Sequence, residues 1–151
     1  ANFNQILTNA ISRGRRIIIV PQISASFNNA GLGGKIAPAN SPFSSCPCTT
    51  SDTEISNFNV LVSGSNLYQS NLSYSYEQFV QELRKTSSIN GGLSTGMSSG
   101  LIDQLDFESG YRFLVADISH SVSQASDNVS KSLQIIGTNS SRYPIDLLVF
   151  V

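Results

Sequence analysis

The sequence has little charge, one histidine and two cysteines. Only 13% of its 151 residues are charged, against roughly 25% in ordinary soluble domains, so its surface must be largely neutral and hydrogen-bonding. A net charge of −1 supplies little repulsion between copies, and weak repulsion favours association. The composition therefore favours a protein that packs against other protein.

The scarcity of cysteine and histidine limits the metal and redox chemistry that we expect. Cys46 and Cys48 flank Pro47, and this spacing is too short for an easy mutual disulfide. With one histidine, a four-ligand zinc site is not available within a single copy. We predict no metal and no cofactor, and interpret both cysteines as free thiols. No apolar run approaches the roughly 18 residues of a transmembrane helix, so we expect no membrane partner.

Catalytic motifs are also missing. His120 follows Asp117 by three residues, but a nucleophilic serine is expected in a context such as G-x-S-x-G, which does not occur. Asp103, Asp106 and Glu108 could supply paired carboxylates, but three acids on one short element are typical of its solvated side. We therefore predict that the chain is not an enzyme and has no catalytic residues.

The charge is unevenly placed along the chain. Residues 1–50 contain Arg13, Arg15, Arg16 and Lys35 and no acid, which gives +4, and the remainder sums to −5. A basic leading segment can contact nucleic acid or an acidic neighbouring subunit, although a polyanion-binding arm normally uses more cations. We predict these four cations as intersubunit or nucleic-acid contacts, the nucleic-acid role being the weaker.

The first third of the chain is predicted to be an extended basic segment, residues 1–54. Residues 2–11 are weakly patterned and indicate an arm or a short helix. A β-branched run predicts a strand at about 15–20, ended by Pro21. Residues 28–53 are rich in Gly, Pro, Ser and Asn and predict a long arm that wraps a neighbour. A chain of this length suits a single domain overall.

Residues 55–151 are predicted to form the β domain. In the segment from Ile55 to Ser63, the side chains of Phe58, Val60 and Val62 alternate with those of their neighbours, which indicates a half-buried strand. Further strands are predicted at 111–118, 132–137 and 145–151, whereas residues 101–108 fit a short helix or a strand. The last strand reaches Val151 with no polar tail, so we expect a partner to cap it or the chain to be part of a longer polypeptide.

One short amphipathic helix is predicted at about 75–86. Tyr76, Phe79, Val80 and Leu83 follow helical spacing and form one apolar stripe. Ser75 and the glutamine three residues later form a candidate capping box. Several short strands without regular βαβ alternation, together with one helix, predict a mainly β fold, an antiparallel jelly-roll-like β-sandwich.

Five segments resemble, in their order, a known family. They are Ile55–Gly64, Tyr76–Phe79, Ser99–Ile102, Tyr111–Asp117 and Ile145–Val151. The series is similar to the double jelly-roll major capsid proteins of eukaryotic DNA viruses and of Polinton-like and adomavirus-like elements. The resemblance implies a β-barrel whose copies join into trimers that tile a shell, and a location in the virion. Such proteins are several times longer, so this chain would be a fragment or a single-domain relative.

The resulting hypothesis is a self-assembling structural protein, a capsid-like subunit. Its partners would be copies of itself, in a trimer-based homo-oligomer, or the remainder of a longer parent chain. One alternative is a lectin-like β-sandwich binding module in which exposed Tyr68, Tyr74 and Tyr111 stack on a ligand. Another is an extracellular filament-forming structural protein, which shares the composition rich in Ser, Gly and Asn.

Overall fold

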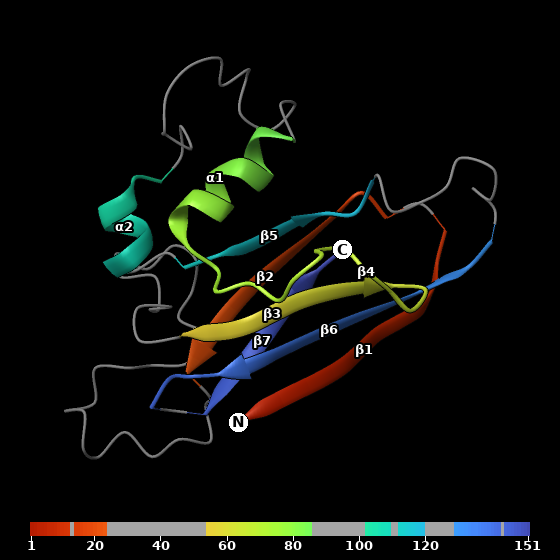
Figure 1. Cartoon of the computed structure of the whole chain (residues 1–151), viewed down its shortest axis with the longest axis horizontal. Helices are drawn as coiled ribbons and strands as arrows, with labels where there is room; N and C mark the ends of the chain where they lie inside the picture. The colour runs from red at the N-terminus through yellow and green to blue at the C-terminus, as the bar shows by residue number, and fades with distance from the viewer. Residues whose placement is uncertain (13, 24–53, 86–101, 110–111, 120–128, 143) are drawn as a thin grey trace.

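The computed structural model describes residues 1–12, 14–23, 54–85, 102–109, 112–119, 129–142 and 144–151 (Figure 1). Within them lie β1 (Asn2–Ile11), β2 (Arg16–Ile23), β3 (Ile55–Val62), β4 (Ser65–Asn66), α1 (Tyr76–Arg84), α2 (Gln104–Ser109), β5 (Leu114–Asp117), β6 (Lys131–Asn139) and β7 (Ile145–Phe150). The predicted arm at 28–53 and the residues Arg13, Lys35, Cys46, Cys48, Tyr111 and His120 lie outside these ranges.

The strands form two antiparallel sheets, which Figure 1 shows as two layers. The first has the order β1-β6-β3-β4 and the second the order β5-β2-β7. Alternate side chains of each sheet point into one shared core, as the two-residue period of a strand requires. This core contains Ile17, Ile19, Val60, Val62, Leu114, Ala116, Leu133 and Ile135. The predicted jelly-roll-like antiparallel β-sandwich class is confirmed.

The helices cover the outer face of the second sheet. Phe79, Val80 and Leu83 of α1 pack with Phe107 of α2 onto Val115 of β5 in a second apolar cluster. The apolar stripe thus predicted the buried face of the helix, and α1 confirms the helix expected at about 75–86. Residues 101–108, which fitted a short helix or a strand, overlap α2.

The N-terminal cap of α1 forms in part. Ser75 has extended backbone angles, and its side chain accepts a hydrogen bond from the backbone N–H of Gln78 at 3.4 Å. A full capping box would return the Gln78 side chain to Ser75. That side chain instead donates to Glu82 at 3.0 Å, so it takes part in the packing of α1 against β5.

The prediction of an arm or a short helix at residues 2–11 is wrong. This segment is β1, an edge strand that pairs antiparallel with β6, which lies near the other end of the sequence. The weak pattern has a physical cause, since most of its side chains are exposed or half-buried. Phe3 lies over Gly137, where an added methyl group would meet the Phe3 ring at 2.5 Å. The division of the chain at residue 54 stays a prediction, although β1 and β2 each pair with strands of the later part.

The prediction that Pro21 ends a strand is also wrong. Strand β2 continues through Pro21, which pairs with Leu147 of β7. A proline is tolerated in a strand at a position where no neighbouring strand needs a hydrogen bond from its nitrogen. The nitrogen of Pro21 faces the β5 side, and β5 begins at Leu114, opposite Ile19, so no ladder hydrogen bond is lost.

Strand β3 has a bulge that the sequence pattern does not reveal. Asn57 has φ of 52°, and the pairing of β3 with β6 shifts between Ser56 and Asn59. Asn59 lies between Phe58 and Val60, so simple alternation would place it on the exposed side, but it is fully buried. Its amide donates to the Tyr68 carbonyl and to the Asn71 side chain, both at 3.0 Å. Its carbonyl oxygen accepts from two backbone N–H groups, at 2.9 and 3.1 Å.

Candidate functional site

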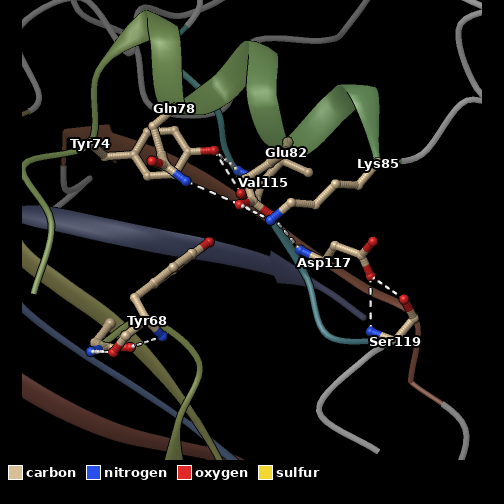
Figure 2. A network of polar contacts seen from close by, with 9 residues as sticks. Tyr68, Tyr74, Gln78, Glu82, Lys85, Val115, Asp117 and Ser119 are labelled. Atoms are coloured by element: carbon tan, nitrogen blue, oxygen red, sulfur yellow. Dashed lines mark hydrogen bonds and ion pairs between the residues drawn. The ribbon is translucent and has the colours of Figure 1, made fainter. Parts of the chain in front are cut away.

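Strand β5 is an edge of the three-stranded sheet, and side chains occupy the place of a neighbouring strand (Figure 2). The Tyr74 hydroxyl accepts a hydrogen bond from the Val115 N–H at 2.7 Å and donates to the Val115 carbonyl at 2.6 Å. A hydroxyl can do both because it has one donor hydrogen and two lone pairs. Tyr74 therefore satisfies both outward backbone groups of Val115.

Glu82 of α1 satisfies the next outward group along the same edge. Its Oε2 accepts from the Asp117 N–H at 2.9 Å, and its Oε1 accepts from Gln78 at 3.0 Å and from Lys85 at 2.8 Å. The Glu82 side chain is 1% exposed, whereas that of Lys85 is 48% exposed. A buried carboxylate needs such partners, so this geometry fixes α1 against β5.

The end of β5 and the adjacent tyrosines extend this polar cluster. The Asp117 carboxylate accepts from the N–H and hydroxyl of Ser119 at 2.9 and 2.6 Å. Burial raises the pKa of Tyr74 well above its ordinary value, although its hydrogen bond with Val115 opposes the shift. Burial, reinforced by the charge of Glu82, also raises the pKa of Tyr68, whose hydroxyl is buried with no partner among the described residues.

These contacts show to which side of β5 the N–H and C=O groups of each residue are directed. In an antiparallel ladder the N–H and C=O of one residue point to the same side, and successive residues alternate. Val115 and Asp117 point away from β2, so Ala116 points toward it. The N–H of Ile118 accordingly donates to the Arg15 carbonyl at 3.0 Å.

The same alternation extends to β7, the opposite edge. Ala116 pairs with Ile17, so the backbone groups of Ile18 and Val20 face β7, where they pair with Phe150 and Leu148. Ile145, Leu147 and Val149 then present N–H and C=O groups outward. Among the described strands, β7 pairs only with β2.

The outer side of β7 is apolar and uncovered in the described structure. Leu148 is 47% exposed, Phe150 is 58% exposed and the adjoining Val151 is 59% exposed. Ile18, on the neighbouring strand β2, is partly buried against the second apolar cluster, which the helices form with Val115. Phe150 and Val151 also line an open groove of about 740 Å³. A strand edge with free backbone groups and apolar side chains is a template for pairing with another strand.

Strand β1 lies beside β7 on this flank of the sandwich. Phe3 and Leu147 both line one groove, and Ile11 and Phe150 both line another. We call this side, formed by β1 and β7, the open flank. The side where α1 covers β5 is the sealed flank. The two flanks differ in hydrogen bonding, since on the sealed flank Tyr74 and Glu82 form hydrogen bonds with outward backbone groups of β5.

Two of the four cations that were predicted as contact residues lie within the described part of the chain. Arg15 and Arg16 line the groove beside Phe150 and Val151, so the structure brings them to the open flank. Arg13 and Lys35 lie outside the described residues. The expectation that Tyr68 and Tyr74 are exposed is wrong, because both are half-buried and their hydroxyls point into the polar cluster.

The candidate catalytic acids have structural partners. Asp103 caps the start of α2 by accepting from the Asp106 N–H at 2.8 Å, and Glu108 accepts from Gln104 at 2.9 Å. The described residues contain no cluster of three or more His, Cys, Asp or Glu able to hold a metal. A cleft of about 290 Å³ beside α2 is lined by Glu54, Glu108 and Arg112 among other residues. No histidine or cysteine is among those lining residues.

No family model matches the chain, and no curated protein or solved structure matches it either. The resemblance to jelly-roll capsid proteins therefore stays a prediction. None of the described helices is long and apolar enough to cross a membrane. The structure defines the chain as an antiparallel β-sandwich with one sealed flank and one open flank.

Proposed function

We propose that this chain is a self-assembling structural subunit that makes repeated protein contacts through its open flank. The observation that carries the proposal is the contrast between the two edges of one sheet. The outward N–H and C=O of Val115 and the outward N–H of Asp117 have partners within the chain. Those of Leu147 and Val149 face outward beside the exposed side chains of Leu148 and Phe150.

The sequence of β7 strengthens this reading. Natural proteins usually protect an edge with charged residues, proline or a bulge. In β7 the single charge is Asp146, near the start of the strand, and the five residues from Leu147 to Val151 are all apolar. Low overall charge removes the general repulsion that would keep such edges apart. Association is therefore favoured by both the local edge and the whole surface.

A capsid-like subunit is the particular form that we favour, because the sandwich suits the jelly-roll resemblance. In that role Arg15 and Arg16, at the end of the open flank, are intersubunit cations, for which acidic residues of a neighbour are natural partners. Location in a virion and a trimer-based shell are parts of the same proposal. A filament-forming protein would use the same open edge but would repeat it without closure.

The proposal is tested by the concentration dependence of the molecular mass, measured by light scattering, with electron microscopy of the assembled fraction. Leu148→Lys places a charge on the outer face of β7 and is expected to reduce assembly. Leu105→Lys is the matched control, because Leu105 is 73% exposed and lies on α2, away from the open flank. Shells or filaments in the micrographs distinguish the two forms, and a strictly monomeric chain at millimolar concentration contradicts the proposal.

A further inference from the structure

We infer that the partner of β7 is the same strand of a second copy, paired antiparallel about a two-fold axis with Val149 opposite Val149. The inference rests on the proposed function and adds the identity of the partner and the register. It joins the three-stranded sheets of two copies into one continuous sheet.

The backbone supports pairing in this register. Leu147 and Val149 direct their N–H and C=O groups outward, and the alternation continues to Val151. With a two-fold axis at Val149, this residue forms a hydrogen-bonded pair with Val149 of the second copy. Leu147 then pairs with Val151 of the second copy, and the reverse pair forms at the other end. Each outward group in this segment gains a partner from an identical surface, as an isologous contact requires.

The outer face supplies the side-chain match. In this register Leu148 lies opposite Phe150 of the second copy, and the pair occurs twice. These are non-hydrogen-bonded positions, where facing side chains come closest. Aromatic and aliphatic pairs across strands stabilise a sheet. The pairing thus covers the two side chains that are 47% and 58% exposed in the single chain.

Asp146 disfavours the registers that are centred closer to the start of β7. With Val149 at the axis, Asp146 faces none of the apolar residues from Leu147 to Val151. With Leu148 at the axis, Asp146 would lie opposite Phe150, and with Leu147 at the axis it would lie opposite Leu148. Covering a carboxylate with an apolar side chain is costly. With Asp146 itself at the axis, two like charges would face each other, which destabilises a strand pair.

The inner face agrees with the same partner. Leu147 and Val149 are partly buried against the core, as are Phe3, Leu7 and Ile11 of β1. Across the two-fold axis they meet Val151 and Val149 of the second copy, so each cross-strand pair from Leu147 to Val151 is apolar on both faces. A strand that matches itself in this way, with low charge and no proline, has the composition of segments that pair with their own copies.

Cysteine cross-linking tests the register. Leu148→Cys and Phe150→Cys are made separately in a chain that also carries Cys46→Ser and Cys48→Ser. Both sites are exposed, so the core is left unchanged, and circular dichroism checks the fold. After mild oxidation, the mixture of the two variants is expected to give several-fold more covalent dimer than either variant alone. Leu105→Cys, on α2, is the matched control for random collision.

Each other outcome overturns the inference. A dimer formed by Leu148→Cys alone places the axis at Leu148. Concentration-dependent assembly of the unaltered chain without any cross-link refutes the pairing of β7 with itself. It leaves the proposed function standing, because the edge of β7 can pair with a different strand of a neighbour. A strictly monomeric chain whose Leu147 and Val149 amides exchange slowly means that another segment of the same chain covers the edge, and then both proposals fail. A monomer with fast exchange at these amides also refutes both.

Discussion

The carboxylate of Glu82 accepts a hydrogen bond from the backbone N–H of Asp117 at 2.9 Å, so a helix side chain takes the place of a strand. Tyr74 does the same for Val115. Together they close one edge of the sandwich from within the chain. The other edge of the same sheet, β7, has no such cover in the described residues, and this asymmetry is the basis of the proposed assembly.

Removing the Glu82 side chain is expected to destabilise the fold and to open the sealed flank. Glu82→Ala leaves the Asp117 N–H without its acceptor, which costs about 1–3 kcal/mol of unfolding free energy. The measurement is urea unfolding followed by circular dichroism. Glu77→Ala, an exposed acid in the first turn of the same helix, is the control and should cost under about 1 kcal/mol. Equal losses in both variants would contradict the role of Glu82.

The Tyr74 hydroxyl is expected to matter more than that of Tyr76. Tyr74→Phe deprives two backbone groups of Val115 of their partner and should cost about 2–4 kcal/mol. Tyr76→Phe removes a hydrogen bond to the Ile102 carbonyl and should cost about 0.5–1.5 kcal/mol. Amide exchange of Val115 should accelerate in the first variant and not in the second. Unchanged exchange in both would show that the edge is not held by this hydroxyl.

Stability is expected to fall at alkaline pH. Burial raises the pKa values of Tyr68 and Tyr74 above their ordinary value of about 10 in the unfolded chain. The folded state thus holds these protons more tightly, so this stability is fully present below about pH 10 and is lost as the pH rises further. Urea midpoints from pH 8 to pH 11 measure the loss. Tyr68→Phe should flatten the profile with little cost at neutral pH, because the Tyr68 hydroxyl has no partner among the described residues. A profile as steep as that of the unaltered chain would contradict this assignment.

The core of the fold was predictable because its signals are local. The apolar stripe of Phe79, Val80 and Leu83 predicted the buried face of α1, and the alternation of Val60 and Val62 predicted the inner face of β3. Both patterns depend on residues that are close in sequence. The class of antiparallel β-sandwich followed from the number of such short segments.

The remaining features depend on partners far away in sequence. Strand β1 was missed because β6, its sheet partner, begins at Lys131, and burial of β1 is slight. Buried Asn59 depends on a turn that returns the backbone of Tyr68 to it. The sealed flank depends on Glu82 meeting Asp117, 35 residues later. The open flank was foreseen only as a last strand in need of a partner, without its register or its outward groups.

The most direct test of the central claim is a proline at a position of β7 whose backbone N–H points away from β2. Val149→Pro removes an N–H that points away from β2, as the nitrogen of Pro21 already does on its own strand, so the sandwich should still fold. Leu148→Pro removes an N–H that faces Val20 and should destabilise the fold. Sedimentation velocity at increasing concentration should show assembly of the unaltered chain and a loss of assembly in the folded Val149→Pro variant. Undiminished assembly of that variant, or an unaltered chain that stays monomeric, would contradict the account.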